Sequence, residues 1–119
     1  MAWKFTQDRP VYLQIAERII RSVLSGEYQP GEQIPAVRAL ALDAAVNPNT
    51  VQHAFTELEN EGVIIAKGTL GRFVTEDRET IELCRKRIAE RTVADFVKSM
   101  GELSITREQA IKMIEEANE

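Results

Sequence analysis

The sequence predicts a mainly α protein of the α+β class, in which three short helices and a β-hairpin precede a tail of two further helices. Two observations predict this order. Apolar residues first recur at the spacing of amphipathic helices, and a short glycine-containing stretch then replaces that period with two extended segments. Beyond this stretch the helical pattern returns in a more polar form. We therefore expect two domains, residues 8–77 and residues 78–119.

The first helix is expected between Pro10 and Ser25. Its apolar residues recur at i, i+3, i+4, i+7, i+8 and i+11, which places them on one face: Tyr12, Ile15, Ala16, Ile19, Ile20 and Val23. Pro10 suits the first turn of a helix, and Gly26 suits the left-handed position after its end. Residues 27–35 then form a connector in which Pro30 and Gly31 mark a tight turn.

Two shorter helices follow the connector. After Pro35 the apolar positions again have helical spacing: Val37, Leu40, Ala41 and Ala44. Asn47 followed by Pro48 predicts the cap and first turn of a third helix, and Gly62 predicts its end. The apolar stripe of this third helix comprises Val51, Ala54, Phe55 and Leu58.

The extended segments 63–66 and 72–75 flank a loop that contains Gly68 and Gly71, which predicts a β-hairpin. Three helices followed by a hairpin are typical of a winged helix-turn-helix. In the tail, Thr106 and Gln109 form a capping-box pattern at the start of the last helix.

The third helix also has a polar face opposite its apolar stripe: Asn49, Gln52, His53, Thr56 and Asn60. Amide, hydroxyl and imidazole groups are the side chains that contact base edges in the major groove. Glutamates crowd the far end and would repel phosphates, so only the N-terminal half is expected to enter a groove. The alternative is a merely solvated face, but the position between a short turn and a hairpin favours DNA.

Basic and small residues nearby extend this interface. Arg38 suits a phosphate or a guanine, although it has the spacing of an ordinary surface arginine too. Lys67 and Arg72 flank the hairpin loop, where glycines let the backbone approach DNA closely. Thr50 is expected either to bind a phosphate or to stabilise the first helical turn.

The composition argues against other classes of protein. The single histidine and single cysteine are far apart in the sequence, and no phosphate-binding loop or metal-ligand spacing is present. We therefore expect no catalytic residues, no cofactor and no metal, and a cytoplasmic protein without a membrane segment. The net charge of −4 is unusual for a DNA-binding protein. It keeps one alternative open, a winged helix that contacts only other proteins.

From Pro10 to Thr75 the sequence resembles the N-terminal domain of GntR-family regulators. The resemblance lies in five motifs: Gly26-x-Tyr28-x-Pro30-Gly31, Ile34-Pro35-x-x-Arg38-x-Leu40-Ala41, Val46-Asn47-Pro48-Asn49-Thr50-Val51, Glu57-Leu58-Glu59-x-Glu61-Gly62 and Gly68-x-x-Gly71-x-Phe73-Val74. One departure is Ala36, where the family usually has a serine, so a helix cap is expected to be lost.

The resemblance implies which residues contact double-stranded operator DNA. By position, these are Arg38, Asn47, Asn49, Thr50 and Gln52, together with a wing tip at Lys67, Gly68 and Thr69 that reaches the minor groove. Fewer basic residues than usual lie on the third helix, where the family often has them and this chain has Pro48 and Gln52.

The tail resembles that of the YtrA subfamily, in which two short helices form a homodimer and members commonly repress ABC-transporter operons. The expected dimer seam comprises Ile81, Cys84, Ile88, Phe96, Val97 and Met100, with Ile111 and Ile114 on the last helix. The alternative for the stripe is packing within its own chain. A dimer implies an inverted-repeat operator. The sequence does not identify a small-molecule effector.

Overall fold

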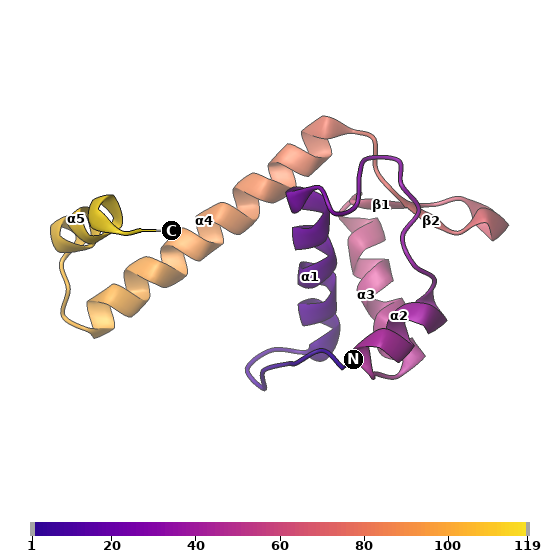
Figure 1. The fold of residues 1–119 in the computed structure, drawn as a ribbon, viewed down its shortest axis with the longest axis horizontal. Coiled ribbons are helices and arrows are strands. Elements are labelled where there is room, and N and C mark those ends of the chain that lie inside the picture. The colour runs from indigo at the N-terminus through magenta and orange to yellow at the C-terminus, as the bar shows by residue number, and fades with distance from the viewer. Residues whose placement is uncertain (1, 119) are drawn as a thin grey trace. The chain divides into compact units, whose positions relative to one another are not determined.

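The computed structural model describes residues 2–118 and contains five α-helices and one two-stranded sheet. The elements follow in the order α1 (Val11–Ser25), α2 (Val37–Ala44), α3 (Pro48–Asn60), β1 (Ile64–Ala66), the 3₁₀ turn η1 (Gly68–Leu70), β2 (Arg72–Val74), α4 (Arg78–Glu102) and α5 (Arg107–Glu116) (Figure 1). The predicted fold class and the order of its elements are confirmed. The chain divides into two compact units, one ending at Glu82 and one beginning at Leu83.

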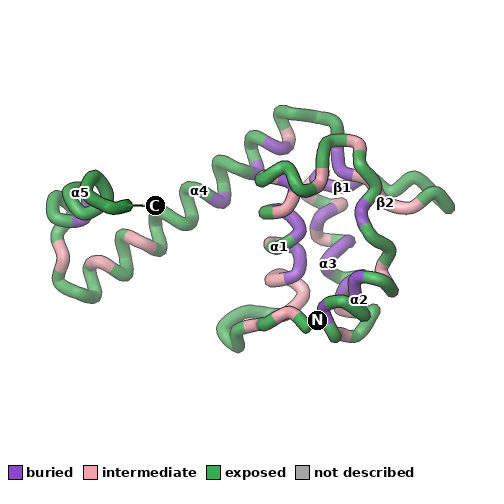
Figure 2. Tube along the Cα trace, viewed as in Figure 1, coloured by how far each residue is buried: buried purple, intermediate pink, exposed green. Residues whose placement is uncertain are grey.

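In the first unit, α1 and α3 pack against each other, and α2 packs on α3. The core lies between them, and Ile15, Val51 and Phe55 are each 0% exposed. Figure 2 shows the buried positions along α1 and α3, as their apolar stripes require. The amphipathic pattern therefore predicts correctly which face of each helix is buried.

The turn between α2 and α3 is tight. Ala45 ends α2 in the left-handed conformation, with φ of 60°, and its N–H reaches back to carbonyls of the last turn. At the other end of α2, Ala36 provides no side-chain cap, as its replacement of the usual serine predicts. The helix-turn-helix thus has one uncapped helix start, at α2.

The hairpin pairs β1 with β2 in antiparallel register, with Ile64 opposite Val74 and Ala66 opposite Arg72. It projects away from the helices (Figure 1). Gln33, in the connector before α2, adds a single bridge to Phe73 on the outer edge of β2. This bridge joins the connector to the wing, an arrangement that the sequence pattern does not reveal.

In the second unit, the capping box of α5 is confirmed. The Thr106 hydroxyl accepts a hydrogen bond from the Gln109 backbone N–H, and the Gln109 side chain accepts one from the Thr106 N–H. The helix α4 continues through Gly101 and ends at Glu102, and Ser104 then takes a left-handed conformation with φ of 59°.

Candidate nucleic-acid interface

The helix α3 begins with a side-chain cap. Asn47 is extended, and its Oδ1 accepts a hydrogen bond from the Asn49 backbone N–H at 2.7 Å. Pro48 occupies the first turn, where an N–H is not needed. The cap uses the Asn47 carbonyl oxygen, which leaves the amide nitrogen of this side chain to donate to DNA.

The N-terminal half of α3 exposes the polar side chains that the sequence predicts. Asn49, Gln52 and His53 are exposed, whereas Thr50 is half-buried. Thr56, one turn further on, donates its hydroxyl to the Gln52 carbonyl at 3.1 Å. Two amides and an imidazole thus face solvent together at the end of the helix that suits groove entry.

The ring of His53 is held in place by Tyr12 at the start of α1. The two rings stack at a centroid distance of 3.5 Å with an interplanar angle of 7°. A shallow hollow of about 370 Å³ adjoins this stack, lined by Val11, Tyr12, Asn49, Thr50 and His53. The sequence pattern assigned Tyr12 only to the core face of α1, and it is half-buried there. In addition, it holds the imidazole of His53 on α3 by stacking.

The tip of the wing is exposed. Gly68 and Thr69 lie on the 3₁₀ turn and are exposed, and the Lys67 ammonium lies 4.8 Å from the centroid of the Phe73 ring. Leu70 is 68% exposed on the same turn. Lys67 is therefore positioned by an aromatic ring next to the tip of the wing.

Arg72 flanks the wing loop as the sequence predicts, and it also has partners on α3; its contact with DNA stays a prediction. Its Nε donates to Glu59 Oε2 at 3.0 Å, and its guanidinium lies 5.0 Å from the centroid of the Phe55 ring. Arg72 therefore links the wing to α3, and its charge offsets one of the glutamates at the acidic end of that helix. The sequence offered only a weak signal for this pair, an acidic residue on the helix and a basic one in the strand.

Arg38 lies in the first turn of α2 and is exposed. Within residues 2–118 it forms no ion pair, so its guanidinium is available to a phosphate or a base. The geometry around Arg38 is compatible with the contact that the resemblance implies.

The expected dimer seam separates into two sets. Ile81, Cys84 and Ile88 are buried in the single chain, at 9%, 4% and 7% exposure. The place of these three residues in a dimer seam stays a prediction. The remaining residues line an apolar groove of about 630 Å³ between the second half of α4 and α5: Phe96, Val97, Met100, Ile111 and Ile114.

The described residues contain no group of three or more histidine, cysteine, aspartate or glutamate side chains placed to hold a metal ion. In the same part of the chain, every helix is too short or too polar to cross a membrane.

A helix-turn-helix that exposes a polar helix beside a projecting hairpin defines the winged helix-turn-helix class of DNA-binding domains. Residues 11–74 match the family of bacterial regulatory proteins named gntR. The chain belongs to the GntR family and is a DNA-binding transcriptional regulator.

The sequence is 33% identical over 111 residues to the HTH-type transcriptional regulator YhcF of Bacillus subtilis (strain 168), covering 93% of this chain and 92% of YhcF. It is 39% identical over 71 residues to the HTH-type transcriptional repressor YtrA of the same organism, covering 60% of this chain and 55% of YtrA. A GntR-family regulator from Listeria monocytogenes has a similar structure, with a TM-score of 0.86, 32% identity and coverage of 96% of this chain and 100% of that one. These relatives are regulators, which is a non-enzymatic function.

Proposed function

We propose that the protein is a homodimeric repressor that binds an inverted-repeat operator and controls a transporter operon. The observation that carries the proposal is the exposed polar half of α3 beside the wing. The similarity to the repressor YtrA supports the direction of regulation. The resemblance of the tail to the YtrA subfamily supports the transporter operon.

In this proposal Asn49, Gln52 and His53 contact base edges in the major groove. Arg38 holds a phosphate or a base, and Lys67 enters the minor groove with the wing tip. Arg72 positions the wing through α3. Because the chain carries a net charge of −4, one protomer is expected to bind DNA weakly. Two protomers on one site combine their contacts through a high effective concentration.

The test of DNA recognition is selection of bound sequences from a random duplex library with the full chain at near-physiological salt. An inverted repeat is expected, with half-sites about one helical turn apart. On the selected site, Arg38→Ala should lower affinity by about 1–3 kcal/mol if the guanidinium grips a base. The matched control is Arg78→Ala, an exposed arginine at the start of α4 that does not line the groove between α4 and α5. Recovery of no sequence would instead favour a winged helix that contacts only proteins.

The dimer is proposed to form through the groove of the second unit. Ile111 and Ile114 remain 50% and 59% exposed at its edge, an apolar surface that a second copy would cover. Replacing both with lysine should give a monomer by analytical ultracentrifugation, with an unchanged circular dichroism spectrum. The matched control is Leu83→Lys, which is 62% exposed on α4 and does not line the groove. A dimer that survives the double substitution would place the interface elsewhere.

A further inference from the structure

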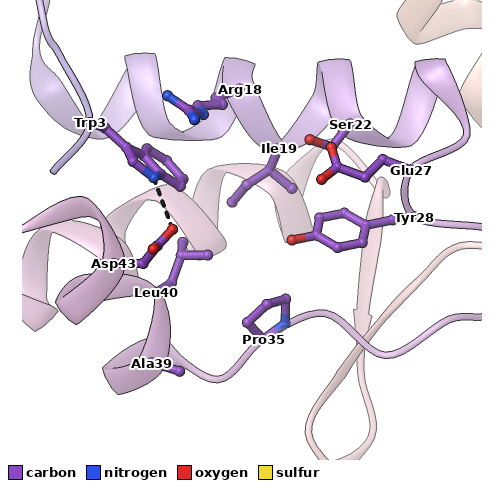
Figure 3. Close-up of a pocket in the computed structure, with 10 residues that line it drawn as sticks. All are labelled: Trp3, Arg18, Ile19, Ser22, Glu27, Tyr28, Pro35, Ala39, Leu40 and Asp43. Atoms are coloured by element: carbon purple, nitrogen blue, oxygen red, sulfur yellow. Dashed lines mark hydrogen bonds between the residues drawn. The ribbon is translucent and has the colours of Figure 1, made fainter. Parts of the chain in front are cut away.

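The first unit contains a pocket to which no residue of the proposed DNA interface contributes. It has a volume of about 340 Å³ and lies among the segment before α1, α1 itself, the connector and α2 (Figure 3). Pockets for small ligands have volumes of about 300–1,000 Å³, so this one suits a small molecule. Its apolar lining includes Ile19 and Leu40, which are 3% and 4% exposed.

The lining also contains two aromatic rings and two carboxylates. Trp3 lies beside Asp43 at one end, and its Nε1 donates to Asp43 Oδ2 at 3.0 Å (Figure 3). This bond leaves Asp43 Oδ1 without a partner among residues 2–118. Glu27 lies at the other end beside Ser22, and the Tyr28 ring lies below it with the hydroxyl end toward the Asp43 side (Figure 3). The pocket thus offers two carboxylate acceptors separated by apolar and aromatic surface.

The electrostatic character of the pocket is acidic. Burial raises the pKa of Tyr28, and the negative charges of Glu27, Glu32 and Asp43 raise it further. The one cation in the lining, Arg18, stacks on the Trp3 ring with its guanidinium carbon 4.0 Å from the centroid. This stacking holds the arginine at the Trp3 end, away from Tyr28 and Glu27 (Figure 3). A positively charged ligand is therefore favoured over an anion.

We propose that this pocket binds a small organic diamine, with one ammonium group on Asp43 and the other on Glu27. The N–H donors of primary ammonium groups match the free carboxylate oxygens, and the carbon chain between them would cover Leu40 and the Tyr28 ring. A bare metal ion is a poorer match, because no cluster of three ligating side chains exists in the described residues.

Occupation of the pocket would act on the DNA-binding face through α2. Asp43 and Ala39 lie on α2, and Arg38 precedes Ala39 directly. A diamine that bridges Asp43 and Glu27 would hold α2 against the connector. This regulatory consequence rests on the proposed operator binding, whereas the binding of the diamine does not.

Trp3 is the only tryptophan of the chain, so its fluorescence reports on the pocket directly. The experiment titrates the full chain, without DNA, with putrescine, a four-carbon diamine. Butanediol and succinate, of the same carbon chain length, serve as the neutral and anionic controls at constant ionic strength. We expect a saturable change with putrescine alone. No saturable change with putrescine, or a comparable one with succinate, would overturn the proposal, and neither result would bear on operator binding.

Two variants test the assigned contacts. Asp43→Asn keeps an oxygen for the Trp3 indole but removes the charge, and Glu27→Gln alters an exposed side chain. Each should weaken putrescine binding roughly tenfold or more, since hydrogen bonds to charged groups are among the stronger ones in proteins. Glu90→Gln, an exposed carboxylate on α4, is the matched control and should leave binding unchanged. Parent-like affinity in folded Glu27→Gln would overturn the proposal even if Asp43→Asn fails to fold.

Discussion

The wing loop contains two glycines whose replacement by alanine should have different consequences. Gly71 has φ of 109° and ψ of −156°, a conformation that is nearly confined to glycine. A Cβ at Gly71 would lie 2.7 Å from Gln33 Nε2, well inside van der Waals contact. Gly68 has φ of 57°, and a Cβ there would meet nothing within 4 Å.

The magnitude follows from these geometries. Backbone strain of this kind costs about 1–3 kcal/mol. In Gly71→Ala the Gln33 side chain must also move, and its hydrogen bond to the Leu70 carbonyl, 2.8 Å long, would be lost. The loss of this hydrogen bond would cost about a further 0.5–1.5 kcal/mol. We expect Gly71→Ala to lower the free energy of unfolding by about 1.5–4.5 kcal/mol. Gly68→Ala occupies the ordinary left-handed region and should cost about 1–2 kcal/mol.

Urea denaturation followed by circular dichroism measures both variants against the parent. If the two have the same midpoint, the contact between Gly71 and Gln33 does not constrain the wing. A double-mutant cycle that combines Gly71→Ala with Gln33→Ala separates the backbone strain from the contact with Gln33. In that background the cost of Gly71→Ala should fall, because the contact is absent and only the backbone strain remains.

Two further changes test single contacts. Ala36→Ser should restore the missing cap of α2 and raise the free energy of unfolding by about 0.5–2 kcal/mol, measured by thermal melting, whereas Ala39→Ser within the same helix should not. A melting temperature that does not rise in Ala36→Ser would contradict this. Glu59 and Arg72 are 27% and 25% exposed, so a double-mutant cycle with glutamine at each position should give a coupling of about 1 kcal/mol in urea denaturation. A coupling of zero would show that the pair does not join the wing to α3.

The sequence predicts the elements of this fold well because each depends on local chemistry. The helical spacing of the apolar residues locates α1 and α3, and the capping residues show where α3 and α5 begin. The sequence predicts less well which residues from distant parts of the chain contact each other. The bridge of Gln33 to Phe73 and the stacking of Tyr12 on His53 join segments that are distant in the chain, and nothing in their local pattern differs from that of ordinary neighbours.

The tail shows the same limit in another form. A stripe of apolar residues predicts burial but does not specify the partner that buries it. Cys84 and Ile88 are covered in the single chain, while Ile111 and Ile114 are left exposed. The sequence pattern therefore predicts one seam, whereas the structure has one buried set and one exposed set of these residues.

The ion pair between Arg72 and Glu59 has a consequence for the kind of DNA that suits the protein. It joins β2 to the C-terminal end of α3. If the wing enters the minor groove and α3 the major groove, as proposed, this link would limit changes in their separation. A wing and a helix held at one separation would fit some groove widths better than others. Minor-groove width varies with sequence, being narrow in A-tracts, so this constraint would favour some flanking sequences that no side chain touches. We expect bases under the wing to influence affinity through groove width as well as through contact.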